Sequence, residues 1–257
     1  DHIAVKTNII TISDFRQKHI AAGGEGAPLA VYGDYLLFGK PGENRIMLNI
    51  GGIANFTYLP ASMDMNEVFS TDVGPGNTIM DAYCKSNFNC SHDQDSMIAM
   101  SGNCNHSLLQ ELLDNRFFEA SFPKTTGPEM FNLTYLQKAL EATGNQNLPA
   151  EDVLCTLNQF SANCIINAIK QTVDVNKANV VFSSGGGMHN TLLMQTMKNA
   201  LPDMIFKTTA DLEINPDAKE AVLFALLANE TLAGNNTLES NKKEVPNVSM
   251  GKISFPC

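Results

Sequence analysis

Three short glycine-rich segments constrain the fold of this chain more than any other feature. They lie at residues 48–56, 71–77 and 183–190. In the first, Gly51 and Gly52 interrupt an apolar pattern typical of a strand, and the third joins a β-branched run to an amphipathic stretch. Glycine lets a backbone turn sharply and approach a neighbouring group closely. The sequence therefore predicts three tight turns at the boundaries between strands and helices.

Tight turns of this kind also indicate a class of ligand. The N–H groups that such turns expose bind phosphate well, and three turns in one chain suggest a nucleotide clamped between two lobes. The net charge of −10 argues against a nucleic-acid binder, because binding to a nucleic-acid backbone needs clustered Lys and Arg. A small phosphorylated ligand is compatible with this charge, since local N–H dipoles oppose it.

The length of 257 residues fits one large domain or two small ones. Hydrophobic residues make up 44% of the chain, which is enough for a globular core. No apolar run approaches the roughly 20 residues that span a membrane, and residues 1–16 lack the apolar centre of a signal peptide. We therefore expect a cytoplasmic protein without a membrane partner. The first residue is not Met, so we also expect a segment upstream of it.

The cysteines favour the same compartment. The six cysteines form no C-x-x-C pair, and the histidines show no metal-ligand spacing. We expect reduced thiols without a metal; the alternative is a bridge or a metal within the group Cys84, Cys90 and Cys104. Seven N-x-S/T sequons are present. We interpret them as chance, because Asn55 lies in a glycine turn that would not tolerate a glycan.

Periodicity predicts the order of strands and helices. Residues 45–50 and 53–59 are predicted to form an antiparallel hairpin around the first glycine turn. The second turn lies at the start of a helix predicted over residues 75–85. Asn190 is placed to cap the helix after the third turn, and Gly234 to end the last helix. Because strands are followed by helices, we expect an α/β architecture. Further predicted elements are strands at 8–12, 180–183 and 205–208, and helices near 108–113 and at 133–143, 152–173, 191–201 and 217–233.

The glycine turns belong to a larger set of motifs that runs in order along almost the whole chain. Each motif alone is weak, but their combination is specific. As a set they resemble the anhydro-N-acetylmuramic acid kinases, a family of the actin, sugar-kinase and Hsp70 ATPase superfamily. The motifs are Asp14-Phe15-Arg16, residues 23–29, residues 49–55, residues 72–77 with Met80-Asp81, residues 123–127 with Phe131-Asn132, residues 185–187 with Asn190, and Gly251-Lys252-Ile253.

The resemblance implies a fold. Members have the ribonuclease-H-like, actin-type ATPase fold, in which two lobes hold ATP in the cleft between them. We expect residues 1–45 to be the remainder of the amino-terminal lobe and residues 46–257 to be the carboxy-terminal lobe. Family members begin with a further segment that carries an Asp-Gly-Thr-Ser type loop for phosphate and Mg²⁺. This loop is absent from the chain, so we expect the first lobe to be truncated.

The resemblance also implies an activity. ATP, water and 1,6-anhydro-N-acetylmuramic acid give N-acetylmuramic acid 6-phosphate and ADP, with the anhydro ring opened and O6 phosphorylated in one event, as part of peptidoglycan recycling and amino sugar metabolism. The expected cofactors are ATP and Mg²⁺, and the expected partners are ATP and the amino sugar, with a homodimer left open. Given the missing loop, the alternative is a non-catalytic nucleotide- or sugar-binding remnant. A chaperone-like ATPase fits less well, because residues 23–29 and the Asp72 turn match the sugar kinases.

Asp72 is the expected catalytic residue. The reaction needs one carboxylate that takes a proton from water as the water attacks the anomeric carbon. Asp72 is followed by Val73 and then by a Gly-Pro-Gly turn at a predicted helix start. The alternative is that Asp72 only caps this helix. Asp81 lies further along the same helix and either supports the sugar site or faces solvent.

The resemblance assigns other residues to ligand binding. For the glycine turns, the alternative is an ordinary tight turn without a ligand. Arg16 suits the lactyl carboxylate of the sugar. For both Arg16 and Glu220, the alternative is a surface or structural role. No metal ligand and no role for residues 123–127 is assigned. The expected nucleotide-binding residues are Asn49, Gly51, Gly52, Asn55, Gly185, Gly186, Gly187, Asn190 and Glu220. The expected substrate-binding residues are Arg16, Gly24, Gly26, Gly74, Gly76, Asn77 and Asp81.

Overall fold

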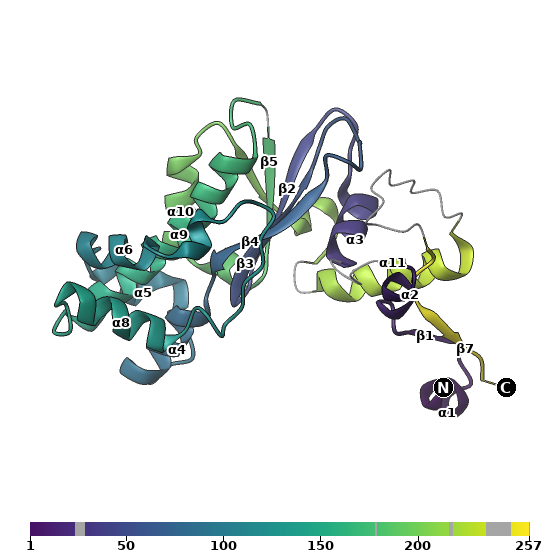
Figure 1. The fold of residues 1–257 in the computed structure, drawn as a ribbon, viewed down its shortest axis with the longest axis horizontal. Coiled ribbons are helices and arrows are strands. Elements are labelled where there is room, and N and C mark those ends of the chain that lie inside the picture. Colours follow the sequence, from purple (N-terminus) through teal and green to yellow (C-terminus); the bar gives the residue numbers. More distant parts are fainter. Residues whose placement is uncertain (24–28, 178, 216–217, 235–247, 257) are drawn as a thin grey trace. The chain divides into compact units, whose positions relative to one another are not determined.

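The structure is a computed structural model (Figure 1). It describes residues 1–23, 29–177, 179–215, 218–234 and 248–256. The predicted substrate-binding residues Gly24 and Gly26 lie outside these described residues. The chain divides into two compact units. The first comprises the described residues of Asp1–Gly42, Leu59–Phe69 and Asp217–Cys257, and the second those of Glu43–Tyr58 and Ser70–Pro216. The expected division into lobes at residue 45 stays a prediction.

The first unit contains a small core between two helices. Helix α3 (Leu29–Phe38) contacts α11 (Lys219–Ala233). A Cβ atom on Gly33 of α3 would overlap Leu223 of α11, so glycine permits this close approach. The buried cluster of the unit consists of Phe15, Leu29 and Leu227. The remaining elements are α1 (His2–Thr7), α2 (Gln17–Ala21) and the antiparallel strands β1 (Thr11–Ser13) and β7 (Lys252–Ser254).

The second unit is built on a mixed sheet. In the described part of the chain this sheet has five strands in the order β4-β3-β2-β5-β6. Two residues join β2 to β3, a connection that only an antiparallel pair allows, whereas β2–β5 and β5–β6 are parallel. This arrangement confirms the predicted α/β architecture. The strands are β2 (Asn44–Ile50), β3 (Ile53–Leu59), β4 (Phe69–Pro75), β5 (Asn179–Ser184) and β6 (Ile205–Thr208).

Helices of the second unit lie along the sheet and gather in a group beside it (Figure 1). Helix α9 (Ala150–Thr172) connects the two sets, because it contacts α10 near the sheet and α4, α5 and α6 in the group. Across the described residues, no helix has both the length and the apolar content needed to cross a membrane. The other helices are α4 (Thr78–Asn87), α5 (Met97–Ser101), α6 (His106–Leu113), α7 (Arg116–Glu119), α8 (Leu133–Thr143) and α10 (Thr191–Ala200), with short 3-10 turns η1 (Gln94–Ser96), η2 (Gly186–His189) and η3 (Thr209–Leu212).

Most predicted elements are present, and the differences have local causes. The strand predicted at 8–12 is present but begins three residues late: α1 runs to Thr7, Asn8 is left-handed with φ of 56°, and β1 starts at Thr11. Strand β4 was not predicted, because the Asp, Gly and Pro that it contains are depleted in strands. The helix predicted from residue 75 therefore begins at Thr78. Gly234 ends α11 as predicted, but with an extended backbone instead of a left-handed one.

Candidate active site

The first and third glycine turns meet at one edge of the sheet in the second unit. Strands β2 and β5 are parallel neighbours with Asn49 opposite Ser184, so their carboxyl ends lie together. A Cβ atom on Gly187 would overlap the Ile50 side chain. One on Gly185, whose φ is +80°, would lie 2.8 Å from the Ile50 carbonyl oxygen. Only glycine therefore allows the two turns to approach this closely.

The second turn is hydrogen-bonded to the first. The Gly76 and Thr78 N–H groups donate to the Gly52 carbonyl at 2.8 and 3.1 Å, and the Asn77 N–H donates to the Gly51 carbonyl at 2.9 Å. A Cβ atom on Gly76 would overlap the Gly51 carbonyl oxygen. The three turns thus form one structure, which we call the glycine junction. It consists of residues 49–52, 74–78 and 185–187.

Asp72 lies on β4, shortly before the glycine junction. Its backbone N–H donates to the Lys124 carbonyl at 2.9 Å, and its carboxylate Oδ2 accepts from the Thr126 N–H at 2.8 Å. Burial raises the pKa of the Asp72 carboxyl above its ordinary value, and the hydrogen bond from Thr126 offsets part of that increase. The result is a half-buried carboxylate, fixed through one oxygen, in the middle of a strand.

The alternative that Asp72 caps a helix is excluded. The residue at the amino-terminal cap of α4 is Asn77, and Asp72 belongs to the strand before it. The turn between them depends on Gly74, whose φ is +141°. A Cβ atom on Gly74 would also lie 3.1 Å from the Cys164 side chain.

Two further predicted residues, Asp81 and Asn55, lie near the junction. Asp81 is in the first turn of α4, and its N–H donates to the Asn77 carbonyl at 2.8 Å. Burial raises the pKa of the Asp81 carboxyl and the nearby His92 lowers it, so this residue is not simply a solvated surface group. Asn55 lies on β3, beyond the first turn, and is half-buried. Their assignments to ligands stay predictions.

The side chain of Asn190 serves the fold. As predicted, it caps α10, accepting from the Leu193 N–H at 2.9 Å. The same oxygen accepts from Ser96 Oγ at 2.7 Å and Asn158 Nδ2 at 2.8 Å. Both partners are buried, with 0% and 1% of their surface exposed. With three donors converging on it, Asn190 Oδ1 is committed within the protein, and a role in nucleotide binding stays a prediction.

Asn190→Ala is expected to lower the free energy of unfolding by about 2 kcal/mol, because it removes a helix cap and leaves two buried donors unpaired. The matched control is Asn132→Ala at the cap of α8, where, among the described residues, the side-chain oxygen accepts from the Tyr135 N–H alone. That change should cost about 1 kcal/mol. Urea denaturation of both variants measures the difference; equal losses would contradict the network around Asn190.

Arg16 and Glu220 belong to the first unit. Arg16 is exposed at the start of α2, and Glu220 is exposed in the first turn of α11. A carboxylate in the first turn of a helix is stabilised by the helix dipole. For Glu220, a structural role at the helix start and the predicted role in nucleotide binding both remain open. For Arg16, a surface role and the predicted role in substrate binding both remain open.

The structure adds residues that sequence patterns did not assign. Ser161 of α9 donates to the Gly76 carbonyl at 2.9 Å and so supports the glycine junction. No local pattern signals this contact, because the two residues are 85 positions apart. Lys124 and Thr126, by contrast, lie in the motif at residues 123–127, which was recognised without a role. The structure places this motif beside Asp72, which Lys124 and Thr126 contact through hydrogen bonds.

Metal ligands are not gathered in the described residues. Within those ranges, no group of three or more His, Cys, Asp or Glu side chains is placed to hold an ion. Five cysteines of the described chain are free thiols, among them Cys84, Cys90 and Cys104. Burial raises the pKa of the Cys84 thiol to about 12, which makes it a poor ligand in its ordinary form.

Comparison with known proteins identifies similar sequences. The family model described as anhydro-N-acetylmuramic acid kinase matches residues 1–251. A protein named anhydro-N-acetylmuramic acid kinase from Pseudoalteromonas atlantica is 56% identical, over 100% of this chain and 65% of its own length. One of the same name from Caldanaerobacter subterraneus is 37% identical, over 98% of this chain and 65% of its own length. The chain thus spans just under two thirds of the length of these relatives.

A solved structure shows a weaker similarity. It is the activator of the 2-hydroxyisocaproyl-CoA dehydratase from Clostridium difficile with bound ADPNP. The TM-score is 0.49 at 17% sequence identity, over 83% of this chain and 69% of that one.

Proposed function

Because the chain belongs to the anhydro-N-acetylmuramic acid kinase family, we propose that Asp72 and the glycine junction are the catalytic part of an ATP-dependent sugar kinase. The proposed substrates are ATP, water and 1,6-anhydro-N-acetylmuramic acid, and the products are N-acetylmuramic acid 6-phosphate and ADP. The observation that carries the proposal is the placement of a half-buried, hydrogen-bonded carboxylate directly before three interlocked glycine turns. A cytoplasmic location and a homodimer remain parts of the proposal.

Asp72 is the proposed general base. Its carboxylate takes a proton from a water molecule as the water oxygen bonds to the anomeric carbon. The bond from that carbon to O6 breaks, and O6 bonds to the γ-phosphorus of ATP as the bond to the ADP oxygen breaks. Burial supports this role, because a carboxyl pKa that is raised toward the working pH makes a stronger base.

The backbone of the glycine junction is the proposed nucleotide platform. The N–H groups of Gly76, Asn77 and Thr78 already donate to the first turn, so they serve the fold. We assign the phosphates to the N–H groups of the other two turns, at Gly51–Gly52 and residues 185–187, where bare backbone lets a ligand approach. Of the predicted nucleotide-binding residues, Asn49 also belongs here, since its amide oxygen lies 2.7 Å from the position of a Cβ on Gly185.

Mg²⁺ is proposed to enter with the ATP phosphates. This ion is usually held by one or two carboxylates together with substrate phosphates, and keeps several waters. Near the junction the described residues offer the Asn49 amide oxygen as a single ligand, which suits an ion held mainly by the ATP phosphates and water. When bound, the ion would neutralise charge on the transferring phosphate.

Product formation tests the proposal. The protein, alone and joined to any segment encoded upstream, is incubated with Mg-ATP and 1,6-anhydro-N-acetylmuramic acid. Mass spectrometry should detect the 6-phosphate sugar, with one equivalent of ADP formed. Binding of ATP or sugar by calorimetry without product from either form would instead support the non-catalytic remnant.

The pH dependence gives a second measurable consequence. The base must be ionised in the free enzyme, so kcat/KM falls as pH drops through the pKa of Asp72. Burial raises this pKa above the ordinary 3.8, so activity should be lost on the acid side at higher pH than an exposed aspartate would give. Initial rates measured over a series of pH values give the fall of kcat/KM on the acid side. An acid limb at or below pH 3.8, in folded protein, would contradict Asp72 as the base.

A further inference from the structure

The segment at residues 124–126 lies along the edge of the sheet beside Asp72. Strand β4 is one of the two edge strands of the described sheet. The Asp72 N–H donates to the Lys124 carbonyl, and the Lys124 N–H donates to Thr71 Oγ1 at 3.0 Å. Thr71 is only 3% exposed and lies within 3.2 Å of the Lys124 carbonyl. These contacts fix the backbone of the segment to β4 at the residue before Asp72 and at Asp72 itself.

We propose that Thr126 is a positioning residue whose backbone N–H fixes the Asp72 carboxylate, and that the Lys124 ammonium fixes the segment that carries it. The proposal rests on the proposed function, because it assigns a role toward the catalytic base. In the described part of the chain, the Thr126 N–H is the hydrogen-bond donor to the carboxylate, at 2.8 Å to Oδ2. Held through Oδ2, the carboxylate has Oδ1 left to accept the proton of the attacking water.

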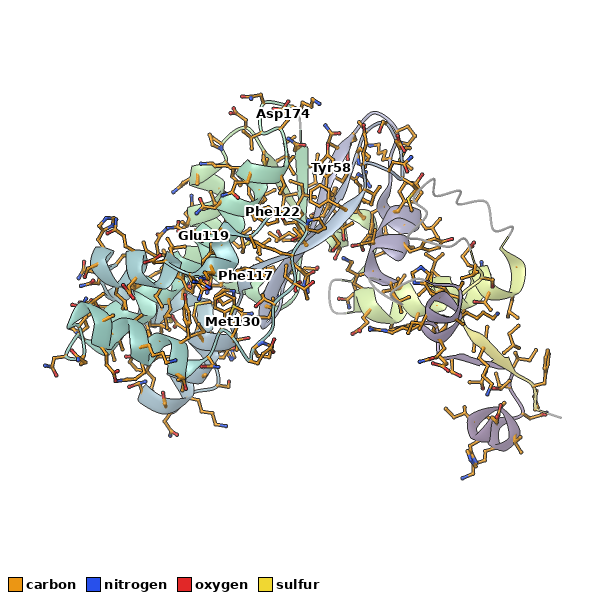
Figure 2. All side chains as sticks on the ribbon, in the orientation of Figure 1. Tyr58, Phe117, Glu119, Phe122, Met130 and Asp174 are labelled. Atoms are coloured by element: carbon orange, nitrogen blue, oxygen red, sulfur yellow. The ribbon has the colours of Figure 1, made fainter. Side chains whose placement is uncertain are left out.

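Lys124 has a distinct environment that suits an anchor. Its Nζ donates to the carbonyls of Phe117 at 2.8 Å and of Phe118 and Ala120 at 3.4 Å, at the carboxyl end of α7. The ammonium has three N–H donors, one for each of these three carbonyls. Its positive charge also suits the negative carboxyl end of the helix. The same Nζ lies 4.5 Å from the Phe117 ring centre and 4.2 Å from that of Phe122. Phe117, Glu119 and Phe122 are labelled around this site in Figure 2.

The helix end that binds Lys124 is itself rigid. Phe117 contacts Phe131 edge-on with ring centres 5.5 Å apart, and Phe118 contacts Phe160 of α9 at 5.9 Å. Aromatic pairs of this geometry add to the stabilisation from burial. Both Phe131 and Phe160 are fully buried. The Lys124 ammonium thus connects the segment beside Asp72 to the helical core of the second unit.

The hydrogen bond has an electrostatic consequence. A donor to the ionised form of a carboxyl favours that form, so the Thr126 N–H lowers the pKa that burial raises. Without the N–H, Asp72 would stay protonated to higher pH. This effect distinguishes positioning of the base from a purely structural contribution.

The test compares Thr126→Pro, which lacks the N–H, with Thr126→Val, which keeps it. In the protein with ¹³C-labelled Asp, NMR titration should show a higher pKa for Asp72 in Thr126→Pro only. In the active enzyme, kcat/KM on the acid limb should fall about tenfold in Thr126→Pro, with the limb unchanged in Thr126→Val. The same Asp72 titration in both variants would overturn the proposal.

Two controls keep the result interpretable. If Thr126→Pro does not fold, an α-hydroxy acid at position 126 removes the N–H and leaves the side chain in place. For the anchor, Lys124→Met should speed amide hydrogen exchange at Thr126 about tenfold relative to the exposed Lys138→Met, and equal exchange would overturn that part. The titration needs no turnover, so a shifted pKa in a protein that forms no product would refute the kinase and retain the positioning role.

Discussion

Asp72→Asn is expected to lower kcat for sugar phosphorylation by about a thousandfold. General base catalysis by a positioned side chain contributes about 10²–10⁴ in rate, and an amide takes no proton at neutral pH. The exchange preserves shape, and the Asn side-chain oxygen accepts the Thr126 N–H as the carboxylate does. The KM for ATP should therefore change little. Rapid-quench measurement of the 6-phosphate sugar separates the chemical step from product release.

The matched control for this prediction is Asp203→Asn. Asp203 is exposed between α10 and β6 and lies outside the glycine junction. It should leave kcat within twofold of the parent, because surface substitutions away from a site are nearly neutral. A kcat for Asp72→Asn within tenfold of that of Asp203→Asn would show that another group takes the proton.

Gly76→Ala is expected to lower the free energy of unfolding by about 3 kcal/mol. A Cβ atom at this position would overlap the Gly51 carbonyl oxygen and lie 3.4 Å from the Ala54 N–H nitrogen. Both obstacles are backbone atoms, so no side-chain rotation relieves them. The hydrogen bonds from Gly76 and Asn77 to the first turn would have to lengthen or break. Equilibrium denaturation with urea measures the loss.

Gly51→Ala is a control on the other side of the same contact. The nearest atom to a Cβ there is the Ile53 carbonyl oxygen at 3.6 Å, which is ordinary van der Waals distance. The loss of unfolding free energy in Gly51→Ala should stay within about 1 kcal/mol. If the two glycines tolerate alanine equally, the close approach of the turns does not hold the junction together.

Local patterns were sufficient for much of the fold. The helix at Leu133–Thr143 begins at the Asn132 cap and ends at Gly144, whose φ is +68°, and both residues signal these ends in the sequence. The hairpin around Gly51 and Gly52 follows from alternating β-rich residues around two turn formers. These features depend on contacts between residues close in sequence, so a single chain reveals them.

Strand β4 shows where local patterns fail. Its residues include Asp72, Gly74 and Pro75, and none of these favours a strand on its own. The strand forms because β3 pairs with it on one side, and on the other the Lys124 carbonyl accepts from the Asp72 N–H. The expected place of Asp72 in a turn was wrong for this reason, and its role as the functional carboxylate stays a proposal.

By itself, the sequence determined the α/β class, the three glycine turns and the family, because glycine spacing, caps and periodicity are properties of neighbouring residues. The tertiary structure alone decided that these turns interlock, that Asn190 serves a buried network, and that Thr126 holds Asp72. Those contacts join residues between 24 and 137 positions apart. Their partners are chosen by the geometry of the folded sheet and helices, which no local pattern encodes.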